Sequence, residues 1–165
     1  MGRRSQLVCA GRCSALPAKV QWPVVTERLS VRVEPIVGEA IDSWLAAIAQ
    51  AMDVRIGSIA RIFGLPAVLH PLWITWLAPD QVDAIVAAAG IPRSVVESMT
   101  LSVYDGAALK LDPNTHRLDE NFPFGAVGFS RFCPECLSES GARWQLQWRL
   151  GWAFACVRHN SLLSD

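Results

Sequence analysis

Two short pairs of metal-binding side chains near the carboxyl end constrain the fold of this chain more than any other feature. Cys133-Pro-Glu-Cys136 is followed, after nineteen residues, by Cys156-Val-Arg-His159. Each pair places two soft or borderline donors on a tight turn, and their separation is typical of the two halves of a zinc ribbon or finger. The sequence therefore predicts one structural Zn²⁺ ion held tetrahedrally by Cys133, Cys136, Cys156 and His159.

The donor set indicates a structural ion rather than a catalytic one. A catalytic zinc keeps one position open for water and usually has a carboxylate nearby as a base. Here three thiolates and an imidazole fill the shell, and we expect Glu135 to be a solvated residue at the tip of the first turn. The sequence offers no nucleophile turn, close carboxylate pair on a patterned element or glycine-rich phosphate loop. We therefore expect no enzymatic activity.

Composition bounds the remaining possibilities. A chain of 165 residues, 52% hydrophobic and 18% charged, suits one medium domain or two small ones that share a core. No apolar run approaches the roughly 18 residues that would span a bilayer. Three of the five cysteines are assigned to the metal, and Cys9 and Cys13 are expected to be free thiols, which fits a reducing cytoplasm. A formal net charge of zero neither supports nor excludes DNA binding.

The chain divides into three parts. Residues 1–27 lack periodicity and are expected to form a flexible leader, because their apolar run is too short for a signal peptide. Residues 28–100 begin with a short extended segment and then read as a helical region with two helix-turn-helix-like pairs. Residues 101–165 are expected to form a loop and a zinc-binding lobe. The predicted fold class is mainly α, with helix-turn-helix-like N-terminal helices followed by a small zinc-finger or ribbon-like lobe.

Apolar residues at helical spacing predict the first helix pair over residues 41–52 and 56–63. Two short helices joined by about four residues are typical of a helix-turn-helix. The second would be the recognition helix, with Arg55, Ser58 and Arg61 off the apolar stripe and available to phosphates or base edges. An α-hairpin that never touches DNA has the same pattern, so both interpretations stay open here.

A second helix pair is predicted further along the chain. One helix begins near Pro79 and ends at Gly90, and the next begins with Pro92 at its first position. The residues before this pair, 66–76, are expected to be an apolar connector. The stretch 100–129 is rich in turn signals and is expected to be irregular.

The segment between the two metal-binding pairs has an ambiguous pattern. Trp144, Leu146, Trp148, Leu150 and Trp152 alternate with polar residues, as in a strand of a zinc ribbon, but the tryptophans also fall at i, i+4 and i+8, as in a helix. Period alone leaves both open. In either case we expect the tryptophans to pack around the metal-binding turns, with a base-stacking surface as the alternative.

On these residues the chain resembles the TniQ family, the target-selection proteins of heteromeric transposition systems. The resemblance covers about residues 28–165 and is strongest in the metal-binding part. It is carried by Gly38-Glu-Ala-Ile-Asp-Ser-Trp-Leu45, Gly64-Leu65, Thr100-Leu101, Tyr104-Asp-Gly106, Arg131-Phe-Cys-Pro-Glu-Cys-Leu137, Trp144-Gln-Leu-Gln-Trp-Arg-Leu150, Cys156-Val-Arg-His159 and Leu162-Leu163.

The resemblance implies an N-terminal helix-turn-helix, a mostly helical body with zinc-finger elements, and no catalytic activity. It implies a DNA-binding or adaptor protein that directs a transposase and its AAA-type ATPase regulator to a target, and in some relatives joins an RNA-guided effector complex. Cys133, Cys136, Cys156 and His159 match the family's metal ligands position for position. It also favours a helix over a strand between the two metal-binding pairs.

The chain departs from the family pattern at its end. Relatives generally continue through a second cysteine pair and further helices, whereas this sequence ends six residues after His159. We therefore expect a short form, a fragment or a truncated remnant of a transposon gene. The alternative to the DNA-binding adaptor is a zinc-stabilised protein-interaction module without direct DNA contact.

Overall fold

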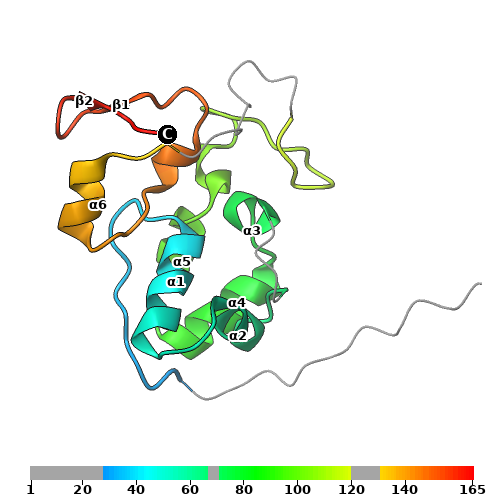
Figure 1. Cartoon of the computed structure of the whole chain (residues 1–165). Helices are drawn as coiled ribbons and strands as arrows, with labels where there is room; N and C mark the ends of the chain where they lie inside the picture. The colour runs from blue at the N-terminus through cyan, green and yellow to red at the C-terminus, as the bar shows by residue number, and fades with distance from the viewer. Residues whose placement is uncertain (1–27, 67–70, 120–130) are drawn as a thin grey trace, which may run out of the picture.

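The computed structural model describes residues 28–66, 71–119 and 131–165, so the expected leader lies outside the described residues. Within them the chain is mainly helical, with one small two-stranded sheet near the carboxyl end (Figure 1). This confirms the predicted mainly-α class. The elements are α1 (Ile41–Ala51), α2 (Ile56–Ile62), α3 (Pro71–Thr75), α4 (Pro79–Ala89), α5 (Arg93–Ser98), the 3₁₀ turn η1 (Leu101–Tyr104), α6 (Pro134–Ser140), the 3₁₀ turn η2 (Leu146–Arg149), β1 (Ala155–Cys156) and β2 (Ser161–Leu162).

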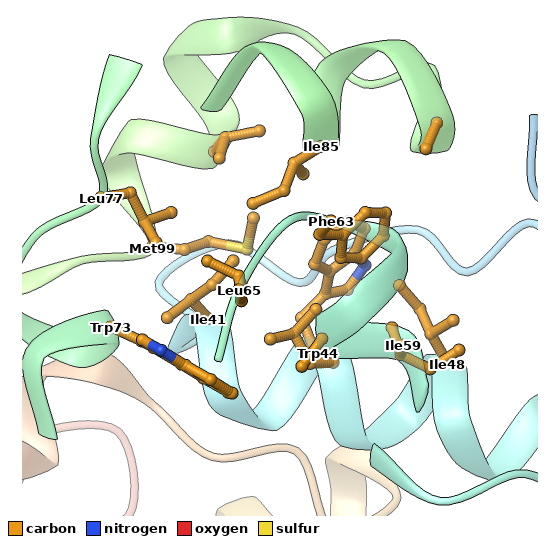
Figure 2. Close-up of a cluster of buried hydrophobic side chains, with 14 of the residues drawn as sticks. Ile41, Trp44, Ile48, Ile59, Phe63, Leu65, Trp73, Leu77, Ile85 and Met99 are labelled. Carbon is orange, nitrogen blue, oxygen red and sulfur yellow. The ribbon is translucent and has the colours of Figure 1, made fainter. Parts of the chain in front are cut away.

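The first predicted helix pair is present. The apolar stripe of α1 shares one core cluster with residues of α2 and α4, and Trp44, on that stripe, is 1% exposed. Its indole ring stacks parallel to Phe63, with ring centroids 6.0 Å apart. Figure 2 shows this aromatic pair inside the main core, to which Ile85 of α4 and Met99 also belong. Trp44 Nε1 also donates to the Val33 carbonyl at 2.9 Å, so the segment before α1 is tied to the core.

The second predicted helix pair is also present. The Gln81 side chain accepts the Ala78 backbone N–H at 2.9 Å, which caps the start of α4. Gly90 ends α4 with φ 69°, a left-handed conformation that glycine adopts without steric cost. Pro92 is not the first helical residue as predicted, because it occupies the extended cap position and α5 begins at Arg93.

Two regions differ from the sequence-based expectation. The expected connector contains the short helix α3, whose Trp73 is buried in the main core. Residues 141–154, which include the tryptophan-rich segment, form neither a strand nor an α-helix but contain the 3₁₀ turn η2. Alternate buried residues of this segment pack in two different clusters. Leu146 packs with Leu101 and Leu109, whereas Trp148 packs with the cysteines.

Backbone hydrogen bonds join the start of α1 to the segment before η2. The Ala40 N–H donates to the Trp144 carbonyl at 2.9 Å, and the Leu146 N–H donates to the Gly38 carbonyl at 2.7 Å. The helical part and the carboxyl-terminal part are therefore connected through main-chain contacts. Among the described residues, no helix has both the length and the apolar character needed to cross a bilayer.

Candidate metal centre

Three local structures bring the four predicted ligands together. Cys133 is the cap residue of α6, where Pro134 suits the first helical position, and Cys136 lies in the first turn of that helix. Cys156 ends β1, and His159 lies in the turn that leads to β2. The antiparallel register pairs Cys156 with Ser161, so the turn between the strands holds the histidine close to the cysteine sulfurs.

The donor atoms have the spacing of a single tetrahedral site. All four lie within 4.8 Å of one another. The Cys136 and Cys156 sulfurs are 3.6 Å apart, and His159 Nδ1 lies 3.3 Å from the Cys133 and Cys136 sulfurs. Ligands bound to one zinc ion at ordinary bond lengths would be roughly 3.3–3.8 Å apart. The three cysteines are free thiols, so the residues fit one metal ion.

His159 has a carboxylate partner that the sequence analysis missed. Its Nε2 lies 3.1 Å from Glu139 Oε1, and its Nδ1 faces the sulfurs. This hydrogen bond raises the pKa of His159 and favours the tautomer whose Nδ1 lone pair is free for a metal. Glu139 lies one turn after Cys136 on α6, a spacing that could have indicated the contact.

The sulfurs are crowded in a partly buried position. Burial, with hydrogen bonds to Cys156 and Cys133, raises the pKa of the Cys136 thiol to about 12. Adjacent thiolates repel one another, so a divalent cation is needed to bring all three into the ionised form. Zn²⁺ bound here would supply a closed cross-link between α6 and the β1–β2 turn rather than an open position for a substrate.

Aromatic side chains cover part of this cluster. Trp148 is 2% exposed and packs with Cys133 and Cys156, and Trp144 meets it edge to face with ring centroids 5.7 Å apart. This confirms the expected packing for these two tryptophans, whereas Trp152 is 46% exposed. Aromatic cover excludes water from one side of the sulfurs, as suits a structural site.

Glu135 is exposed, in agreement with the prediction. Its carboxylate nevertheless lies 3.1 Å from the Cys133 sulfur, closer than a freely solvated tip residue would be.

The three predicted DNA-contact residues lie together on α2 and its cap. Arg55 is the cap residue and Arg61 lies in the last turn, and both are exposed. Neither guanidinium forms an ion pair within the described part of the chain. Ser58 is half-buried, and its backbone N–H donates to the Arg55 carbonyl at 2.8 Å. The metal centre lies on other elements, so these are two separate candidate sites.

Comparison with known proteins identifies one relationship. The model of the TniQ family matches residues 30–163, which is most of the chain and includes both α2 and the four predicted metal ligands. No curated protein matches the sequence.

Proposed function

Because the chain belongs to the TniQ family, we propose that it is a non-enzymatic adaptor that binds DNA and helps direct a transposition machinery to its target. The proposal combines the family with one structural observation, which is the pair of exposed arginines on α2. α1 and α2 would act as a helix-turn-helix, with α2 against the DNA. Arg55 and Arg61 would contact phosphates or base edges, and Ser58 would add a shorter polar contact.

The metal centre would have a structural role in this adaptor. Three sulfurs and one imidazole favour Zn²⁺ over harder cations, and a full shell leaves no position for a reacting water. One Zn²⁺ ion bound by Cys133, Cys136, Cys156 and His159 would keep α6 against the β1–β2 turn. The partners would be DNA, a transposase and its AAA-type ATPase regulator, or an RNA-guided effector, in the cytoplasm.

DNA binding is tested by fluorescence anisotropy with a generic labelled duplex over a range of salt concentrations. For phosphate contacts, the logarithm of the affinity falls linearly with the logarithm of salt concentration, with a slope of about −0.9 per contact. The double variant Arg55→Gln/Arg61→Gln should bind more weakly. Its salt dependence should also be shallower, with the magnitude of the slope reduced by about 2. Arg117→Gln is the control, since Arg117 is exposed on a loop far from α2 in sequence.

Binding that is absent at every salt concentration would remove the DNA part of the proposal. Equal losses in the α2 double variant and in Arg117→Gln would instead assign the affinity to diffuse charge rather than to α2.

A second candidate function is a zinc-stabilised protein-interaction module without DNA contact. It is favoured by exposed apolar side chains on and beside the β1–β2 sheet of the metal lobe, the name used here for residues 131–165. These side chains are Trp152, Phe154, Val157 and Leu162. Exposed apolar groups of this kind often mark protein contacts. Co-purification with a transposase or its ATPase, unchanged by Arg55→Gln/Arg61→Gln and lost with Phe154→Ser/Leu162→Ser, would support this function over DNA binding.

A further inference from the structure

A groove on another face of the helical part belongs to neither candidate site. Its volume is about 760 Å³. Its walls come from the α3–α4 connection, the start of α4, α5, η1 and the loop over residues 105–116. It shares no residue with α2 or with the metal centre. This volume is within the roughly 300–1,000 Å³ range of pockets that bind small ligands.

The floor of the groove is apolar. Leu77, Val82 and Leu111 line it, and their exposed fractions are 5%, 3% and 7%. On one wall the rings of Trp76 and His116 stack, with centroids 3.7 Å apart and planes 9° apart. This flat aromatic pair sits beside a floor that can receive an aliphatic side chain.

The 112–117 loop holds that aromatic wall in place. The His116 N–H donates to the Asp112 carbonyl, and the Asp112 N–H donates to the Arg117 carbonyl, both at 2.8 Å. His116 has φ 54°, in the left-handed region, where histidine is found more often than most non-glycine residues. The wall is therefore formed before any ligand binds, which lowers the ordering cost of binding.

The rim of the groove is acidic. It carries the carboxylates of Glu97, Asp105 and Asp112, against the single guanidinium of Arg93. Arg93 is paired with Glu97 and Asp83, so Glu97 is neutralised within the protein and Asp105 and Asp112 supply the remaining negative charge of the rim. A rim of this sign repels phosphates, which argues against nucleic acid at this face.

Two of the rim carboxylates are fixed by the backbone. Asp105 accepts the Leu111 N–H at 2.9 Å, and Asp112 accepts the Thr115 N–H at 2.7 Å. The bonds from Thr115 and Asn114 lower the pKa of Asp112, which keeps this group ionised. A carboxylate offers about four lone-pair positions, so each can still accept from a ligand.

We propose that this groove is a docking site for a basic peptide segment of a protein partner, with an arginine against the Trp76–His116 wall and an apolar neighbour on the floor. Charge complementarity selects a cationic segment. The aromatic wall selects arginine over lysine, because a planar guanidinium stacks on rings and pairs with carboxylates through a two-pronged contact. The inference does not depend on DNA binding by α2.

The test uses ¹⁵N-labelled, zinc-loaded protein and two capped peptides, one of alternating arginine and leucine and one of alternating glutamate and leucine. The arginine peptide should shift the Trp76 indole N–H resonance and the backbone resonances of α5 and the 105–116 loop, in a saturable manner. The glutamate peptide should leave these resonances in place. Equal shifts with both peptides, or shifts confined to other faces, would overturn the proposal.

Charge variants test the acidic rim directly. Asp105→Asn/Asp112→Asn keeps the acceptor oxygens but removes two charges, and should weaken binding of the arginine peptide about tenfold or more. Glu34→Gln/Asp53→Asn removes two exposed charges outside the groove, and asparagine tolerates the φ of 52° at position 53. Equal weakening by the two double variants would reject the groove as the binding site.

The variant Trp76→Leu, which leaves the rim charges in place, tests the stacking. It should weaken binding of the arginine peptide more than binding of the same peptide with lysine in place of arginine. An equal effect on the two peptides would reject stacking.

Discussion

Glu39 and Arg143, separated by 104 positions in the sequence, form a two-pronged ion pair between the helical part and the metal lobe. The Glu39 side chain has no exposed surface, and that of Arg143 is 14% exposed. Ser43 Oγ and the Ile36 N–H donate to the same carboxylate at 2.7 and 3.0 Å. A buried charge persists only when its acceptors are filled in this way. The pair therefore sets the position of the metal lobe on α1.

Glu39→Gln should destabilise the fold strongly. Glutamine keeps the shape but leaves the Arg143 guanidinium largely buried without a counter-charge, which in comparable buried pairs costs about 3–5 kcal/mol. Urea unfolding of the metal-loaded protein measures the change. Glu34→Gln is the control, since Glu34 pairs with Arg32 at the surface and such pairs contribute about 1 kcal/mol or less.

A double-mutant cycle isolates the pair itself. Arg143→Met alone should also be costly, because it leaves the Glu39 carboxylate short of donors, whereas Glu39→Gln combined with Arg143→Met should cost less than the sum of the two changes. Additive costs would mean that the two residues stabilise the fold independently, and the pair would then not explain how the lobe is held.

Metal removal should unfold the carboxyl-terminal lobe before the helices. α6 has no fully buried residue, and the sheet consists of two strands of two residues each, so packing alone holds α6 and the β1–β2 turn only weakly. Residues 143–150, in contrast, are tied to the start of α1 through Arg143 and the Trp144 carbonyl. Structural zinc stabilises small finger domains by about 10–16 kcal/mol near neutral pH. Hydrogen–deuterium exchange after addition of a chelator should therefore show fast exchange over α6 and residues 155–163, and continued protection of α1 and α4.

Elemental analysis and ligand variants provide the controls for that experiment. The purified protein should contain one metal ion per chain, and Cys136→Ser should lose it. Cys13→Ser, outside the described residues, should retain it. A chain that keeps its exchange protection after the metal is stripped would show that the lobe is stabilised by packing alone.

Trp44→Phe should loosen the segment before α1. The substitution keeps an aromatic ring in the core but removes the hydrogen bond from Nε1 to the Val33 carbonyl. An unsatisfied carbonyl and a smaller ring together should cost about 2–3 kcal/mol. Thermal unfolding measures this loss, and faster amide exchange over residues 29–36 would locate it. Trp152→Phe, at an exposed tryptophan, should have almost no effect.

The sequence predicted those features in which neighbouring residues decide the structure. The spacing within Cys133–Cys136 and Cys156–His159 depends on two tight turns, so the ligand set could be read directly, and these four side chains do converge. The stripe on α1 and the left-handed Gly90 are equally local. Each of these signals is contained within a few consecutive residues.

The features that the sequence did not reveal depend on contacts between distant segments. Neither Glu39 nor Arg143 stands out by position, because their partnership arises only when the lobe folds back on α1. The apolar residues that alternate around Trp148 are buried, but they pack against two separate clusters. A period of two therefore did not indicate a strand here, and the segment forms a 3₁₀ turn. Helix α3 begins at Pro71 and has only five residues, which is too short to show a periodic pattern.

Glu139→Gln should weaken metal binding without removing a ligand. The Glu139 carboxylate lies 3.1 Å from His159 Nε2, and it orients the ring so that Nδ1 faces the sulfurs. Loss of such an outer partner typically costs 10- to 100-fold in metal affinity. Competition between the zinc-loaded protein and a chromophoric chelator measures this change. Glu135→Gln is the matched control on the same helix: its carboxylate lies beside the Cys133 sulfur rather than the histidine, so its removal should not weaken the site. If both variants lower the affinity equally, the effect reflects the general negative charge of α6, and Glu139 has no particular role in orienting His159.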